Sequence, residues 1–152
     1  MSELSTEVQN TDIVNDELAL DIKEDSEIFL EFLSEVLDHL EESESNILSI
    51  EDETCDYEVI NAIFRSIHSI KGSAGFLGLT RMQRLSHELE TLLDKARKNE
   101  ITITQEIINI SLSAIDALRK LRDNLAIRVD TELGKVTDSS LKEQSIDIEP
   151  LV

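Results

Sequence analysis

The residues best suited to chemistry lie in the stretch 67–78, which reads Ile-His-Ser-Ile-Lys-Gly-Ser-Ala-Gly-Phe-Leu-Gly. The imidazole of His68 can act as a nucleophile or as a base near neutral pH. On a helix, Lys71 would lie one turn away and bring an ammonium group beside whatever the ring carries. Gly72 is unexpected, because a glycine inside a helix costs about 0.5–1 kcal/mol relative to alanine. That cost indicates a place where a partner approaches the backbone.

A second polar pair, His87 and Glu90, is separated by one helical turn further along the chain. We place both on the flank of their helix opposite to its core line of leucines. If this helix lies antiparallel beside the one that carries His68, Glu90 could accept a hydrogen bond from Nδ1 of His68. Such a bond would fix the tautomer with its lone pair on Nε2 and make that nitrogen a better nucleophile.

These residues alone leave simpler explanations open. The glycines at 72, 75 and 78 could serve only to pack helices closely and to end a helix, with His68 a solvated surface residue. His87 and Glu90 could be ordinary charges on an exposed helix face. His39 lies in an acidic run, and we interpret it as a partly exposed helix histidine without a role.

Two common kinds of site have no support in the sequence. A di-iron bundle needs Glu-x-x-His motifs on two helices, and the chain has no such motif, so we expect no metal site. Neither a Gly-x-x-x-x-Gly-Lys-Ser/Thr loop nor a Gly-x-Gly-x-x-Gly fingerprint is present to hold a nucleotide. We therefore expect that the chain does not phosphorylate itself.

Four segments position these residues, and each repeats apolar side chains at the three- and four-residue spacing of an amphipathic helix. The first runs from about residue 24 to 50, and the second ends near the glycines. Thr80 and Gln83 fit a capping box that begins the third, which ends near Lys98, and Thr104 is suited to cap the fourth. The second segment carries the stripe Ile60, Ile63, Phe64, Ile67, Lys71 and Ala74. Short connections then favour an all-α, antiparallel up-down four-helix bundle.

The domain organisation follows from the same pattern. We predict an acidic N-terminal tail at 1–18, the bundle at 19–126, and one further short helix followed by a linker at 127–152. The formal charge of −19 excludes a general affinity for nucleic acid or for an anionic membrane surface, since both need excess Lys and Arg. A single cysteine, Cys55, and the lack of an apolar run of about 20 residues favour a cytoplasmic protein.

The stretch from Asn61 to Gly78 closely resembles the motif of histidine phosphotransfer (Hpt) domains, in particular those at the N-terminus of chemotaxis histidine kinases of the CheA type. Histidine, lysine three residues later, glycine four residues later and further glycines match together. The stretch from Leu85 to Arg97 is similar to the third helix of the same family. The resemblance extends over about residues 24–126, and the acidic N-terminal tail is not accounted for by it.

The resemblance implies a role for each residue. His68 would be the phosphoacceptor, phosphorylated on Nε2, with Lys71 near the phosphoryl group, Glu90 bonded to Nδ1 and His87 beside them. A histidine kinase ATP-binding domain would deliver the γ-phosphoryl group, and an aspartate of a response-regulator receiver domain would take it. We assign Gly72, Arg65, Ser69 and Gly75 to the surface that these partners contact.

The domain would then have no cofactor of its own, because the kinase or the receiver would hold ATP and magnesium. It would be a phosphocarrier rather than a complete enzyme, either as part of a larger histidine kinase or as a free-standing protein. The alternative function is a non-catalytic helical interaction domain whose acidic first half docks a basic partner. Neither alternative involves nucleic acid or a membrane.

Overall fold

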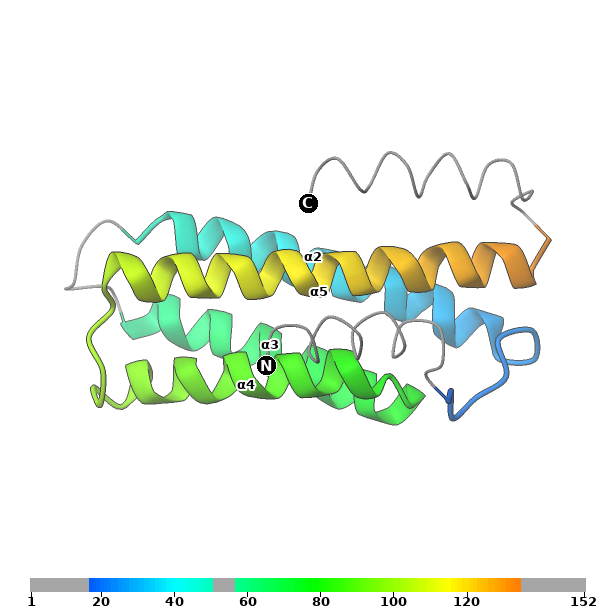
Figure 1. The fold of residues 1–152 in the computed structure, drawn as a ribbon, viewed down its shortest axis with the longest axis horizontal. Coiled ribbons are helices and arrows are strands. Elements are labelled where there is room, and N and C mark those ends of the chain that lie inside the picture. The colour runs from blue at the N-terminus through cyan, green and yellow to red at the C-terminus, as the bar shows by residue number, and fades with distance from the viewer. Residues whose placement is uncertain (1–16, 51–56, 135–152) are drawn as a thin grey trace, which may run out of the picture.

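A computed structural model describes residues 17–50 and 57–134 of the chain. These residues form four α-helices and no strand: α2 (Ser26–Leu48), α3 (Tyr57–Leu77), α4 (Thr80–Arg97) and α5 (Gln105–Glu132). Each helix packs against the next along the chain, and α5 closes the bundle by packing against α2. The helices lie side by side and alternate in direction (Figure 1). The predicted all-α bundle is therefore confirmed.

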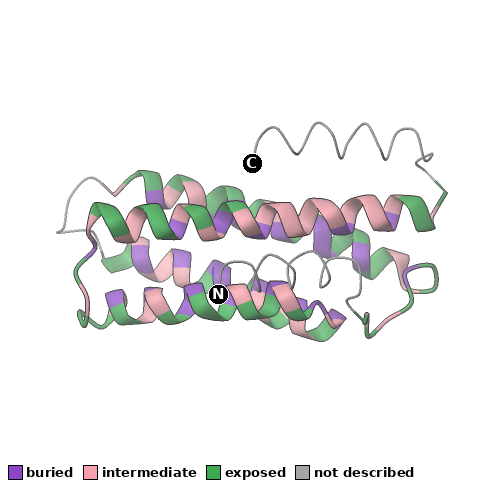
Figure 2. Cartoon of the chain, viewed as in Figure 1, coloured by how far each residue is buried: buried purple, intermediate pink, exposed green. Residues whose placement is uncertain are grey.

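The core is built almost entirely from aliphatic residues and a few phenylalanines. Buried positions follow the inner stripe of every helix, and the exposed positions face outward (Figure 2). The stripe predicted for α3 is wrong at one position: Ile70 is 1% exposed and belongs to the core, whereas Lys71 lies at the edge of the bundle. The largest fully buried side chains include Phe29, Val36, Leu40, Ile47, Ile63, Ile67, Leu77, Ile115, Leu118 and Val129.

The turn between α3 and α4 sets how these two helices meet. Gly78 has a φ of +80°, and a β-carbon there would lie 2.8 Å from the backbone of the segment before α2, so only glycine fits. The amide of Leu79 donates to the carbonyl of Ala74 at 2.9 Å, which closes a Schellman turn at the end of α3. The glycine cluster thus ends α3 and brings α4 back along it after two residues.

This turn also explains why the predicted capping box is wrong. Leu79, held by the Schellman turn, is already the N-cap of α4, and its carbonyl accepts the amide of Gln83. Thr80 is therefore the first helical residue, and no side chain caps this helix. The cap predicted for α5 is confirmed, since the Thr104 hydroxyl accepts a hydrogen bond from the amide of Ile107 at 3.3 Å.

The last helix extends further than expected. α5 continues to Glu132, and Val129 is fully buried, so the boundary that we placed after residue 126 falls inside a packed helix. At the same end of the bundle, the amide of Ala19 donates to the carbonyl of Leu77 and attaches the chain before α2 to α3 (Figure 1). Residues 1–16 of the tail predicted at 1–18, Cys55, and residues 135–152 of the segment predicted as a short helix and linker lie outside the described residues.

Candidate functional site

His68 lies on the outer side of α3, where its side chain is 61% exposed. The core stripe of the helix runs along Ile63, Ile67 and Ile70, and His68 falls beside this stripe. Its ring therefore reaches solvent, as predicted, while its backbone is held in the middle of a packed helix.

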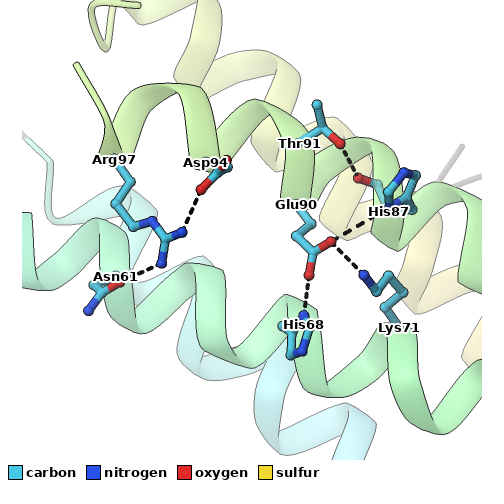
Figure 3. Close-up of polar contacts among 8 residues, drawn as sticks. All are labelled: Asn61, His68, Lys71, His87, Glu90, Thr91, Asp94 and Arg97. Carbon is cyan, nitrogen blue, oxygen red and sulfur yellow. Dashed lines mark hydrogen bonds and ion pairs between the residues drawn. The ribbon is translucent and has the colours of Figure 1, made fainter. Parts of the chain in front are cut away.

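Glu90 of α4 points toward α3 and joins the two basic residues of that helix (Figure 3). One carboxylate oxygen, Oε2, pairs with Nδ1 of His68. The other, Oε1, accepts a hydrogen bond from Nζ of Lys71 at 2.7 Å. The contact that the sequence suggested between Glu90 and His68 is thus present, although Lys71 also binds the same carboxylate.

The predicted placement of Glu90 on the flank opposite to the core is wrong. Glu90 is only 7% exposed and lies next to Leu89 and Leu93, which are core residues of α4. Its carboxylate is buried in the seam between α3 and α4. A buried carboxylate is tolerated there because each of its oxygens has a basic partner.

The protonation of this group follows from its surroundings. Burial by itself would raise the pKa of Glu90, but the hydrogen bonds from Lys71 and His68 outweigh it and lower the pKa below its usual value. Glu90 is therefore ionised at neutral pH and can only accept hydrogen bonds. It follows that Nδ1 of His68 carries the proton, and in the neutral ring the lone pair is on Nε2.

His87 is the third basic residue around Glu90. Its side chain is 64% exposed, and Nδ1 lies 3.6 Å from Oε1 of Glu90, which is within ion-pair distance but too long for a hydrogen bond. The four residues predicted as the reactive group, His68, Lys71, His87 and Glu90, are therefore brought together. Glu90 is at their centre.

A groove of about 600 Å³ lies between α2 and α3 on the other side of His68. Gly72 forms part of its wall, and a β-carbon at this position would meet no atom within 4 Å. A second, smaller groove of about 270 Å³ shares Glu35, Gly72 and Ser73 with the first and is bordered by the exposed side chains of Ile28 and Phe76. The first groove is lined by Glu35, Asp38, His39, Glu42, His68, Ser69, Gly72 and Ser73.

The four residues assigned to partner contacts have different surroundings. Ser69 and Gly72 line the groove beside His68. Arg65 is exposed on α3 but is not among the lining residues. Gly75 faces α4 instead, because a β-carbon there would lie 2.5 Å from Nε2 of Gln83. That atom is the end of the exposed, flexible Gln83 side chain, which could move aside for a β-carbon.

The sequence interpretation missed the contribution of α2. His39, which we set aside, lines the same groove as His68, together with three carboxylates of the same helix. The spacing of these residues within α2 only shows that they share an outer face. Their position beside His68 depends on how α2 packs against α3, which no local pattern reveals.

Other kinds of site are not evident in the described part of the chain. Residues 17–50 and 57–134 contain no group of three or more His, Cys, Asp or Glu side chains arranged to hold a metal ion. None of the helices formed by these residues is both long and apolar enough to cross a membrane.

Comparison with known proteins shows the family of the chain. Residues 27–127 match the Hpt domain family. The chain is 39% identical over 98 residues to the chemotaxis protein CheA of Salmonella typhimurium and 38% identical over 95 residues to the sensor histidine kinase CheAY of Helicobacter pylori. These alignments cover 64% and 62% of this chain but only 15% and 12% of the two relatives.

A solved structure shows the same fold. The CheA phosphotransferase domain from Thermotoga maritima superposes with a TM-score of 0.62 at 34% identity, covering 66% of this chain and 95% of the other. The family match and the shared helical bundle make this chain a histidine phosphotransfer domain. The chain belongs to the Hpt domain family, and its relatives are of the CheA type.

Proposed function

We propose that His68 accepts a phosphoryl group on Nε2 from the ATP-binding domain of a histidine kinase and passes it to an aspartate of a response-regulator receiver domain. The observation that carries this proposal is the pairing of Nδ1 with the ionised Glu90. That bond assigns the proton to Nδ1 and leaves the lone pair of Nε2 directed away from Glu90, on a side chain that is 61% exposed.

The chemistry needs no proton transfer at the attacking atom. The lone pair of Nε2 forms the bond to the γ-phosphorus as the bond from phosphorus to the bridging oxygen breaks, and ADP leaves. The imidazole then carries positive charge, which the carboxylate of Glu90 stabilises through Nδ1–H. In the second step an aspartate oxygen attacks the same phosphorus, and the bonding electrons return to Nε2.

The charges around His68 suit a phosphoryl group that must both arrive and leave. Lys71 places a cation on the Glu90 side of the ring, and positive charge stabilises phosphoryl oxygens during transfer. The wall formed by α2 contributes the carboxylates of Glu35, Asp38 and Glu42. Their negative charge repels a phosphoryl group on His68, which makes the modified histidine a ready donor to the next acceptor.

The open groove supplies the approach path for the partner domains. Gly72 keeps the wall beside His68 free of a side chain, and the adjoining apolar border offers Ile28 and Phe76 for contact. In this proposal the partner kinase or receiver holds ATP and magnesium, and the domain contributes the nucleophile and a docking surface. We also propose that transfer takes place in the cytoplasm.

The decisive experiment incubates the full chain with ATP labelled at the γ-phosphorus and the ATP-binding domain of a cognate CheA-type kinase. We expect a label on His68 that is stable in alkali and labile in acid, and that passes to a receiver domain when magnesium is added. If no label appears, the chain is the non-catalytic interaction domain that its acidic first half also allows.

A further inference from the structure

The ring of His68 has a second neighbour besides Glu90. Phe64, one turn earlier on α3, lies nearly parallel to it, with an angle of 11° between the ring planes and 6.0 Å between the ring centroids. This is an offset-stacked arrangement at a distance where aromatic pairs attract. Because the His68 side chain is mostly exposed, few other groups can restrain the ring.

The bond to Glu90 does not fix the ring by itself. One hydrogen bond directs Nδ1, but the torsion angle about the Cβ–Cγ bond of a histidine has a broad range of allowed values. The ring can therefore still tilt about the line from Nδ1 to the carboxylate. A parallel ring beside it limits this tilt. Phe64 and Glu90 together therefore determine where Nε2 points.

Phe64 is in turn held by a residue of α4. The guanidinium carbon of Arg97 lies 3.9 Å from the centroid of the Phe64 ring, which is a close cation–π contact. Arg97 is fixed by the side chains of Asn61 and Asp94, one on each helix (Figure 3). The donor–acceptor distances are 3.3 Å to Oδ1 of Asn61 and 2.5 Å to Oδ1 of Asp94.

We infer that Phe64 and Arg97 are positioning residues for the phosphoacceptor: Arg97 holds the Phe64 ring, and the Phe64 ring holds the plane of His68. The inference rests on the proposed function, since it assumes that Nε2 of His68 is the reacting atom. Both residues lie between α3 and α4, and along α3 they are on the side of His68 opposite to Lys71. The inference gives this part of the helix contact a role in orienting His68. Neither residue touches the phosphoryl group.

The test uses phosphoramidate, a small phosphodonor that needs no docking surface. Phe64→Leu keeps an apolar side chain but removes the ring, and we expect phosphorylation of His68 to slow about three- to tenfold. Phe64→Tyr keeps the ring and should restore the rate. Tyr57→Leu removes an exposed aromatic side chain from the same helix and is the matched control, expected to react like the unchanged protein.

Arg97 is tested in the same way. Arg97→Met removes the cation at similar length and should slow the reaction less than Phe64→Leu, because the Phe64 ring remains. Arg97→Lys should restore the rate, since an ammonium can also bind the face of a ring. Arg119→Met, which removes the cation of an ion pair between Arg119 of α5 and Glu44 of α2, is the control.

A spectroscopic measurement separates positioning from a general loss of structure. The ¹⁵N chemical shifts of the His68 ring report the tautomer. We expect Phe64→Leu to raise the share of the Nε2–H form while the helix content, measured by circular dichroism, stays unchanged. Unchanged ¹⁵N shifts and an unchanged phosphorylation rate in Phe64→Leu would overturn the inference. So would a variant that reacts more slowly with a protein donor but normally with phosphoramidate, because that result indicates a role of Phe64 in docking. If the unchanged protein takes no phosphoryl group on His68 from any donor, the proposed function itself fails.

Discussion

Glu90 and His68 are 22 residues apart in the sequence, and a hydrogen bond between the Glu90 carboxylate and Nδ1 of His68 joins α4 to α3. The contact depends on the turn at Gly78, which returns α4 along α3 after two residues and sets the register between them. A glycine that ends a helix therefore helps to bring the histidine and the carboxylate together.

The first prediction concerns His68, the proposed phosphoacceptor. We expect His68→Gln to abolish phosphorylation while the melting temperature stays nearly unchanged, because an exposed side chain contributes little to stability. The glutamine amide can still donate to Glu90. The check is a labelling assay together with a thermal melt by circular dichroism. Labelling at the normal rate would mean that His87 or His39 is the acceptor.

The second prediction concerns the partner of Nδ1. Glu90→Ala should slow phosphorylation roughly 10- to 100-fold, the usual effect of removing a group that orients a functional histidine. Glu90→Gln keeps the shape and an acceptor oxygen but removes the charge. Its phosphorylation rate should therefore lie between those of the unchanged protein and Glu90→Ala. Rates with phosphoramidate and the ¹⁵N shifts of His68 measure both effects. An unchanged rate with an unchanged tautomer would reject the role of the hydrogen bond.

The third prediction follows from the lowered pKa of Glu90. A carboxyl group whose pKa is lower in the folded state stabilises the fold above its unfolded pKa of about 4.3, and this contribution is lost as the pH falls through the folded value. The free energy of unfolding of the unchanged protein should therefore decline more steeply than that of Glu90→Gln over this range. Urea titrations of both proteins at a series of pH values give the difference. Parallel curves would show that the pKa of Glu90 is not lowered.

The sequence predicts much of this site because the main signals are local. The spacing of His68, Lys71 and Gly72 on one helix, and of His87 and Glu90 on the next, already indicates a reactive surface between neighbouring helices. The short turn then leaves little choice in how the two helices pack. The hydrogen bond to Nδ1 could be anticipated for this reason.

What the sequence did not reveal depends on packing between helices. The sequence places Glu90 on an outer flank because it shares a helix face with His87 opposite to the core leucines. A carboxylate is seldom buried, and only the basic side chains from α3 make its burial acceptable. His39 became relevant because α2 packs beside α3. The extension of α5 was missed because its apolar pattern weakens after Leu125, although Val129 still packs fully into the core.

The fourth prediction tests the apolar border of the proposed docking surface. Phe76 is 64% exposed beside the smaller groove, so Phe76→Ala should leave the fold intact. If a partner covers this side chain, the truncation should weaken binding at least about tenfold, given the value of burying a phenylalanine. Leu48→Ala is the matched control, because Leu48 is equally exposed but lies outside both grooves. Titration calorimetry with the kinase and receiver domains measures the affinities, and equal effects of the two variants would remove Phe76 from the docking surface.

The last prediction concerns Gly72, where helix stability and function should change in opposite directions. A β-carbon there meets no atom within 4 Å, so Gly72→Ala should raise the free energy of unfolding by about 0.5–1 kcal/mol. Gly72→Leu should also fold, since the position opens into the groove. Its side chain would nevertheless occupy the approach path one turn from His68, and we expect phosphoryl exchange with both partner domains to be lost.

Each Gly72 variant is measured by a thermal melt and by transfer assays on the same preparation. Alanine should reduce transfer less than leucine, because it fills less of the groove. Loss of folding together with transfer in Gly72→Leu would mean that Gly72 is needed for helix packing, which the open space around it argues against. Normal transfer in Gly72→Leu would mean that neither partner docks over this part of α3, and the approach path would have to lie on the side of His68 that faces Arg65.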